Sequence, residues 1–165
     1  MDTNKLERFL NAATDLSSSL DAFVDEQRNV GKAVRAKDWA ALEKALAQAN
    51  GTSELVAFGE EERNQAWNEL LAELGLPADS SVFRASLALP LAARASLTDS
   101  YRSLRLSAMR ARIENDALGS FVGSSASILS KTIEELFPER KGRVYGKSGK
   151  PRALGSDALV LNAAF

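Results

Sequence analysis

The sequence predicts an all-α protein: an elongated antiparallel hairpin of two long helices, a third long helix packed along it in a three-helix, coiled-coil-like bundle, and a flexible C-terminal tail. Three observations support this class. Apolar residues recur at alternating spacings of three and four, the pattern of a helix that buries one stripe. No segment keeps the two-residue alternation of a half-buried strand. Gly75 with Pro77, Pro90 and Pro138 fall where one periodic segment gives way to the next or to the tail.

The first long helix is predicted from about Asn4 to about Arg35. Its apolar seam contains one polar residue, Gln27, and the spacing of Asn4 and Glu7 is that of a capping box. Sustained spacing of this kind is typical of coiled-coil packing. The predicted seam consists of Leu6, Phe9, Ala13, Leu16, Leu20, Phe23, Gln27, Val30 and Val34.

A tight connection over residues 36–38 leads into the second long helix, with Asp38 as its N-cap. Gly75, followed by Pro77, is a strong stop signal. Between them, Gly51 and Gly59 leave two alternatives, a local break or one bent helix, and we favour one bent helix.

A short helix is predicted from about Val82 to Leu89, and a long final helix begins near Pro90 and ends before Pro138. Asn115 is the polar residue of its central turns, and we interpret it as a register-setting residue rather than a ligand-binding one. The predicted seam of this helix consists of Leu97, Tyr101, Leu104, Ala108, Ala111, Asn115, Leu118, Val122, Ser125, Leu129, Thr132 and Leu136.

Charge separates the chain into two predicted parts, a helical domain over residues 1–137 and a flexible basic tail over residues 138–165. The tail has six basic and two acidic residues, so it carries a charge of +4 and the rest of the chain −5. A segment so rich in Gly, Lys and Arg buries too little apolar surface to offset the entropy of ordering it.

Composition excludes several classes of function. The chain has no cysteine and no histidine, which removes disulfides, thiolate nucleophiles and His-ligated metals. A net charge of −1 gives no argument for nucleic acid or an anionic membrane, and no stretch is apolar enough for a membrane span. We therefore expect a cytoplasmic protein that is not an enzyme, with no cofactor, no nucleic-acid partner and no membrane insertion.

The last third of the final helix is the strongest candidate for a protein-binding surface. Its apolar residues flank the seam on both sides, which makes a face wider than one packed helix covers, and exposed apolar patches mark binding sites. Small residues from Gly119 to Ser127 leave two interpretations, close packing inside the bundle or docking of a partner helix. The predicted surface consists of Leu118, Phe121, Val122, Ser125, Ile128, Leu129, Ile133 and Leu136.

Several stretches together resemble the FlgN family, and the resemblance spans most of the chain. The most distinctive is the tail motif Tyr145-Gly146-x-x-Gly149, followed by Ser156, Asp157 and Ala158. The Ala/Ser-rich stretch from Leu87 to Ser96 departs from the family pattern. The other stretches that carry the resemblance are residues 36–38 with Leu42, residues 61–63 running into residues 70–76, and Asn115 with Leu118, Ser124 and Ser125.

The resemblance implies a chaperone that binds the C-terminal helical segments of the hook-associated proteins FlgK and FlgL. Such a chaperone prevents premature assembly of its cargo and delivers it to the flagellar type III export gate. Carried over by position, the face from Leu118 to Leu136 would bind the cargo, and Tyr145, Gly146 and Gly149 would contact the export gate.

Two other interpretations remain open from the residues alone. The main alternative is a structural or adaptor coiled-coil protein whose exposed face forms homo-oligomers, and a weak homo-oligomer is also compatible with the chaperone interpretation. In a third interpretation the basic tail binds nucleic acid, which would show as steeply salt-dependent binding to duplex DNA.

Overall fold

The structure is a computed structural model that describes residues 3–136, 144–145 and 151–152. It contains helices α1 (Thr3–Ala36), α2 (Trp39–Glu73), α3 (Val82–Ala88) and α4 (Leu91–Leu136), and strands β1 (Val144–Tyr145) and β2 (Pro151–Arg152). The predicted all-α class is confirmed. The chain forms two compact units, Met1–Ser120 and Phe121–Phe165. The division into a helical domain over residues 1–137 and a tail over residues 138–165 stays a prediction.

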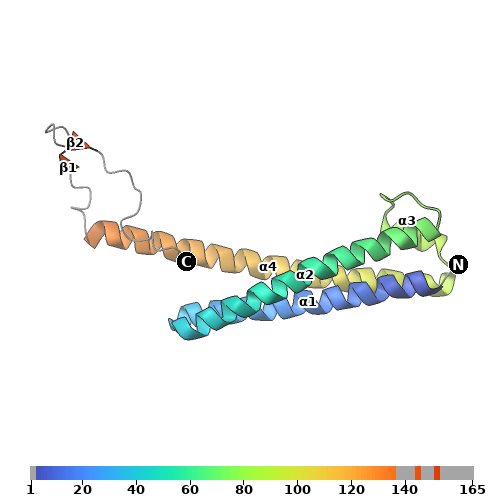
Figure 1. The fold of residues 1–165 in the computed structure, drawn as a ribbon, viewed down its shortest axis with the longest axis horizontal. Coiled ribbons are helices and arrows are strands. Elements are labelled where there is room, and N and C mark those ends of the chain that lie inside the picture. The colour runs from blue at the N-terminus through green and yellow to red at the C-terminus, as the bar shows by residue number, and fades with distance from the viewer. Residues whose placement is uncertain (1–2, 137–143, 146–150, 153–165) are drawn as a thin grey trace. The chain divides into compact units, whose positions relative to one another are not determined.

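In the first unit α1 and α2 lie side by side as an antiparallel hairpin (Figure 1). The connection is short because Lys37 adopts a positive φ of 55°, which reverses the chain at the end of α1. Asp38 then caps α2, since its carboxylate accepts a hydrogen bond of 3.0 Å from the Ala41 amide. The predicted N-cap is therefore confirmed. At the other end α1 begins at Thr3, so Asn4 is already helical and the predicted capping box with Glu7 is wrong.

Helix α2 is continuous through residues 51–60, as the single-helix alternative predicts. Gly59 lies where α2 crosses α1 closely: a Cβ there would be 3.3 Å from Leu16 Cδ1 and 3.6 Å from Leu16 Cα. Glycine at this position therefore sets the separation of the two helices. The helix stops where Gly75 takes a positive φ of 64°, and the Leu76 amide donates back to the Leu71 carbonyl at 2.9 Å.

A cluster of buried apolar side chains joins the N-terminal half of α1, the C-terminal half of α2, α3 and the start of α4. Phe9 and Trp67 pack ring to ring across α1 and α2, with centroids 5.1 Å apart. Helix α3 begins at the N-cap Ser81 and contributes Ala85 and the adjoining Leu89 to the core. The core residues are Leu6, Phe9, Ala13, Leu16, Ala66, Leu70, Leu71, Ala85, Leu89, Leu97 and Leu104.

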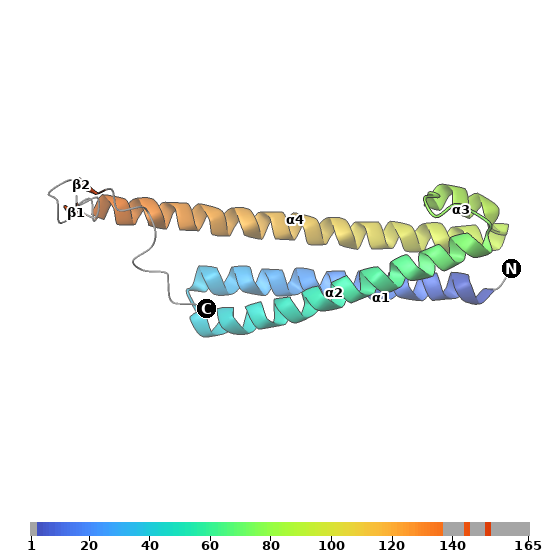
Figure 2. The ribbon, with the colours of Figure 1, turned by 45° about the horizontal axis from the view of Figure 1, so that its top comes forward.

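Within the first unit α4 follows α1 in the same direction (Figure 2). Its buried residues are Leu97, Leu104, Ser107 and Ala111. Ser107, not the predicted Ala108, is buried, and Tyr101 is 40% exposed, so both predicted seam positions are wrong. The predicted seam steps by four residues and then three from Leu97, whereas the buried positions from Leu104 step by three and then four. Since a helical period of 3.6 residues permits either order, the contact with α1 decides between them.

Polar side chains fix the register of α1 against α4. Gln27 is 4% exposed, and its Nε2 donates a hydrogen bond of 2.9 Å to Asn115 Oδ1. The adjacent Arg28 donates through Nε to Glu114 Oε2 at 3.3 Å. Gln27 and Asn115, which interrupt the two predicted seams, therefore pair with each other, and this supports the register-setting interpretation of Asn115.

In the second unit the described residues beyond α4 form a small antiparallel pair of two-residue strands. Val144 pairs with Arg152 and Tyr145 with Pro151. These four residues leave the all-α class unchanged. Strands this short carry too few residues to show alternation, so the hydrophobic pattern cannot reveal them.

Candidate protein-binding face of the final helix

The C-terminal part of α4 presents large apolar side chains to solvent. In the second unit the exposed fractions of Val122, Ile128, Leu129, Ile133 and Leu136 lie between 41% and 67%. Ser125 is exposed as well, and Phe121 is half-buried. The eighth predicted residue, Leu118, is half-buried and belongs to the first unit. All eight predicted binding residues are therefore helical, and six of them are exposed.

Helical geometry places these residues on one side of α4. At 3.6 residues per turn, positions 118, 122, 125, 129, 133 and 136 fall within a narrow arc, and positions 121 and 128 widen it on one flank. An exposed face of this width is what an amphipathic partner helix would cover. That these residues bind a partner stays a prediction.

Two of the small residues of the same region, Gly119 and Gly123, lie outside the apolar arc. Gly119 and Gly123 point away from the arc that contains Val122 and Leu129, and a Cβ on either glycine would meet no atom within 4 Å. Within the first unit, no described neighbour therefore requires a glycine at position 119. Ser125, in contrast, is a small residue that lies within the arc.

The residues expected to contact the export gate are only partly described. Tyr145 lies in β1, paired with Pro151 of β2. Gly146 and Gly149 lie outside the described residues.

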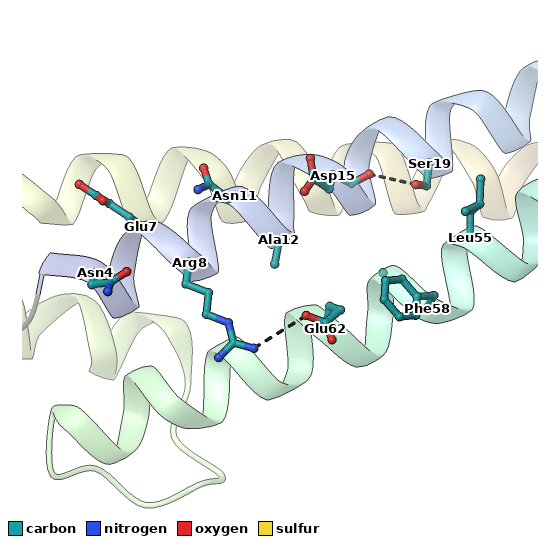
Figure 3. A pocket seen from close by; sticks show the side chains of 11 residues that line it. Asn4, Glu7, Arg8, Asn11, Ala12, Asp15, Ser19, Leu55, Phe58 and Glu62 are labelled. Carbon is teal, nitrogen blue, oxygen red and sulfur yellow. Dashed lines mark hydrogen bonds and ion pairs between the residues drawn. The ribbon is translucent and has the colours of Figure 1, made fainter.

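A shallow groove of about 510 Å³ lies between α1 and α2 (Figure 3). Leu55 and Phe58 of α2 give it an apolar end. At the other end Arg8 forms an ion pair of 2.6 Å with Glu69 and a longer one of 3.8 Å with Glu62, which Figure 3 shows across the groove. These partly exposed ion pairs link α1 to α2 and add little to the buried core that joins the two helices.

Among the described residues that line the groove, Ser19 has the only hydroxyl side chain. The hydroxyl of Ser19 donates to the backbone carbonyl of Asp15, so no side-chain base activates it. No group of three or more potential metal ligands occurs among the described residues. None of the described helices combines the length and the apolar character needed to cross a bilayer.

The family model of the FlgN protein matches residues 1–153. The chain belongs to the FlgN family. The comparisons with curated proteins and with solved structures found no match. Residues 154–165 lie beyond the matched range, whereas Tyr145, Gly146 and Gly149 lie inside it.

Membership of the FlgN family gives the chain a class of function. FlgN proteins are chaperones of flagellar export with hook-associated proteins as partners, and the family is not known for enzymatic activity. The expected family, the chaperone role and the link to flagellar assembly are thereby confirmed. An exposed apolar face on a helical FlgN protein is consistent with binding another helix.

Sequence reasoning missed a second exposed stripe on α4, formed by Leu106, Met109 and Ile113. Their spacing of three and four is the signal that could have revealed it. The signal is ambiguous, because this stripe and the buried seam lie on the same helix and share the same period.

Proposed function

We propose that this chaperone binds the C-terminal helical segments of the hook-associated proteins FlgK and FlgL in the cytoplasm and delivers them to the flagellar export gate. The bound segment lies along the apolar face of α4, from Leu118 to Leu136. The single observation that carries the proposal is the exposure of Ile128, Leu129 and Leu136, each above 60%, on one side of a helix.

Physical chemistry favours this mode of binding. The terminal helix of an assembly subunit is amphipathic and associates prematurely if its apolar side stays in water. Each large apolar side chain that becomes buried contributes about 1.5–3 kcal/mol, so a few such contacts suffice for a specific complex. Ordering of the cargo segment on binding lowers the net affinity, which suits a chaperone that must release its cargo.

The test is calorimetry with a C-terminal segment of FlgK or FlgL. The double variant Leu129→Glu/Ile133→Glu places two charges on the proposed face and should weaken binding by at least about 2 kcal/mol, roughly thirtyfold in Kd. The matched control is Ser120→Glu/Ser127→Glu, which adds the same charges on the opposite side of α4 and should bind cargo normally. Equal binding by both variants would rule out the proposed face.

We further propose that delivery is a function of Tyr145, Gly146 and Gly149, separate from cargo holding. A chain that ends at Phe137 keeps the whole of α4 and should retain cargo in a pull-down, while cargo export in a motile strain is lost. Tyr145→Ala in the full chain should likewise retain cargo in the pull-down and lose cargo export. Loss of cargo binding on truncation would instead assign the holding function to the tail.

The same exposed face also supports self-association, because a second copy could cover it. Analytical ultracentrifugation distinguishes this alternative from the cargo-binding proposal. A tight dimer that the Leu129→Glu/Ile133→Glu variant converts to monomer would favour a structural homo-oligomer. The chaperone proposal predicts a species that is monomeric or only weakly associated without cargo and a 1:1 complex with it.

A further inference from the structure

A second apolar stripe lies on α4 inside the first unit. Leu106, Met109 and Ile113 are 48%, 51% and 65% exposed, and they are spaced by three and four residues. Positions 106, 109 and 113 lie on the side of α4 opposite the buried Leu104 and Ala111. The stripe is thus unpartnered in the described chain and separate from the surface that packs on α1.

Arginine residues border this stripe on both flanks. If Leu106, Met109 and Ile113 are assigned to the a and d positions of a heptad, Arg105 and Arg112 take g positions and Arg110 takes an e position. Arg105 and Arg110 form no ion pair among the described residues. Arg112 is held only loosely, 3.8 Å from the highly exposed Asp116.

Charged residues also limit the length of the stripe. Arg102 occupies the preceding d position and is paired with Asp99 at 3.1 Å, while Asp116 occupies the following d position. The apolar seam therefore covers about two helical turns. A seam this short supports a weak and reversible contact rather than an obligate one.

We propose that this stripe is a docking site for an acidic amphipathic helix of another protein, with apolar residues at its centre and Glu or Asp on both flanks. Charge complementarity selects this occupant. The g and e positions of a helix pair face each other, and three arginines there match carboxylates. The site is distinct from the cargo-binding face proposed above and does not depend on it.

Two other occupants fit the arrangement less well. A second copy of this chain would bring its own arginines against Arg105, Arg110 and Arg112, and like charges at facing positions are unfavourable. A membrane surface requires a broad apolar face. Here the apolar arc is narrow, and Asp99 and Asp116 bound it at both ends.

The test uses two synthetic three-heptad helices with Leu at a and d, one with Glu and the other with Lys at all e and g positions. Fluorescence anisotropy measures their binding to the full chain at low and at high salt. The triple variant Arg105→Glu/Arg110→Glu/Arg112→Glu reverses the charge of the stripe. The matched control Lys32→Glu/Lys44→Glu/Arg84→Glu changes the same total charge at exposed positions on α1, α2 and α3.

We expect the wild-type chain to bind the Glu helix at least tenfold more tightly than the Lys helix, with the difference reduced by salt. The triple variant should reverse this preference and the control variant should keep it, with unfolding curves confirming that both are folded. Met109→Ser, which changes no charge, should weaken binding of the Glu helix by at least fivefold.

Three results would overturn the proposal. The first is equal binding of the two helices, or a preference that the triple variant leaves unchanged. The second is tight binding to phosphatidylserine vesicles that the triple variant abolishes, which would assign the stripe to a membrane surface. The third is a dimer that Met109→Ser dissociates, which would assign it to a second copy of the chain.

Discussion

Gln27 and Asn115 show what single residues reveal in this sequence. Each interrupts an apolar seam, so each can be recognised as unusual without a structure. The hydrogen bond between them is 2.9 Å long and joins residues 88 positions apart in sequence. It could not be predicted, because it depends on how α4 is aligned along α1. The pair costs desolvation and in return disfavours other alignments of α4 on α1.

Asn115→Ala should therefore destabilise the first unit by about 1–2 kcal/mol, since it leaves the buried amide of Gln27 without its acceptor. The double variant Gln27→Leu/Asn115→Leu should recover most of this loss, because it removes both polar groups together. Urea unfolding followed by circular dichroism measures both effects. A double variant that is less stable than Asn115→Ala would contradict the assigned role of the pair.

At the scale of elements, cap and stop signals predicted both ends of α2, whereas the capping box predicted for α1 was wrong. Asp38 caps α2, Gly75 ends it and Ser81 opens α3, each through local hydrogen bonds that the sequence itself specifies. Local signals of this kind could not predict which residues of α4 are buried between Leu97 and Ala111. Ser107 replaces Ala108 in the seam because the position of α1, not the local sequence, selects the buried side.

The two central glycines of α2 give a matched test of helix packing. A Cβ added at Gly51 would meet no atom within 4 Å, so Gly51→Ala should stabilise the protein by about 0.5–1 kcal/mol. Gly59→Val should destabilise it by about 1–3 kcal/mol, because the added side chain meets Leu16 at the close crossing of α1 and α2.

Thermal and urea unfolding of the two glycine variants measure these changes against the parent chain. The informative outcome is that Gly51→Ala raises the free energy of unfolding while Gly59→Val lowers it. Helix propensity alone would favour replacing either glycine by a non-glycine residue. A stabilising Gly59→Val would show that the two helices are not held at the described separation.

At the scale of the whole molecule, the sequence predicted the all-α class and the family. The binding face from Leu118 to Leu136 stays a prediction, although six of its eight residues are exposed. The sequence indicated exposed apolar surface there. It did so because a helix with apolar residues on both flanks of its seam has more apolar surface than one neighbour can bury. The stripe of Leu106, Met109 and Ile113 was not predicted, because periodicity cannot tell which of two apolar stripes on one helix is buried. Only the packing of α4 against α1 separates them.

Cargo binding at the apolar face near the C-terminal end of α4 is the proposal on which the chaperone function of this chain depends. Hydrogen–deuterium exchange of the full chain, with and without a FlgK or FlgL C-terminal segment, measures which amides the cargo covers. We predict that cargo slows exchange in peptides covering residues 118–136 and leaves residues 101–113 unchanged. Protection confined to the groove between α1 and α2, with no change over residues 118–136, would contradict the proposed binding face.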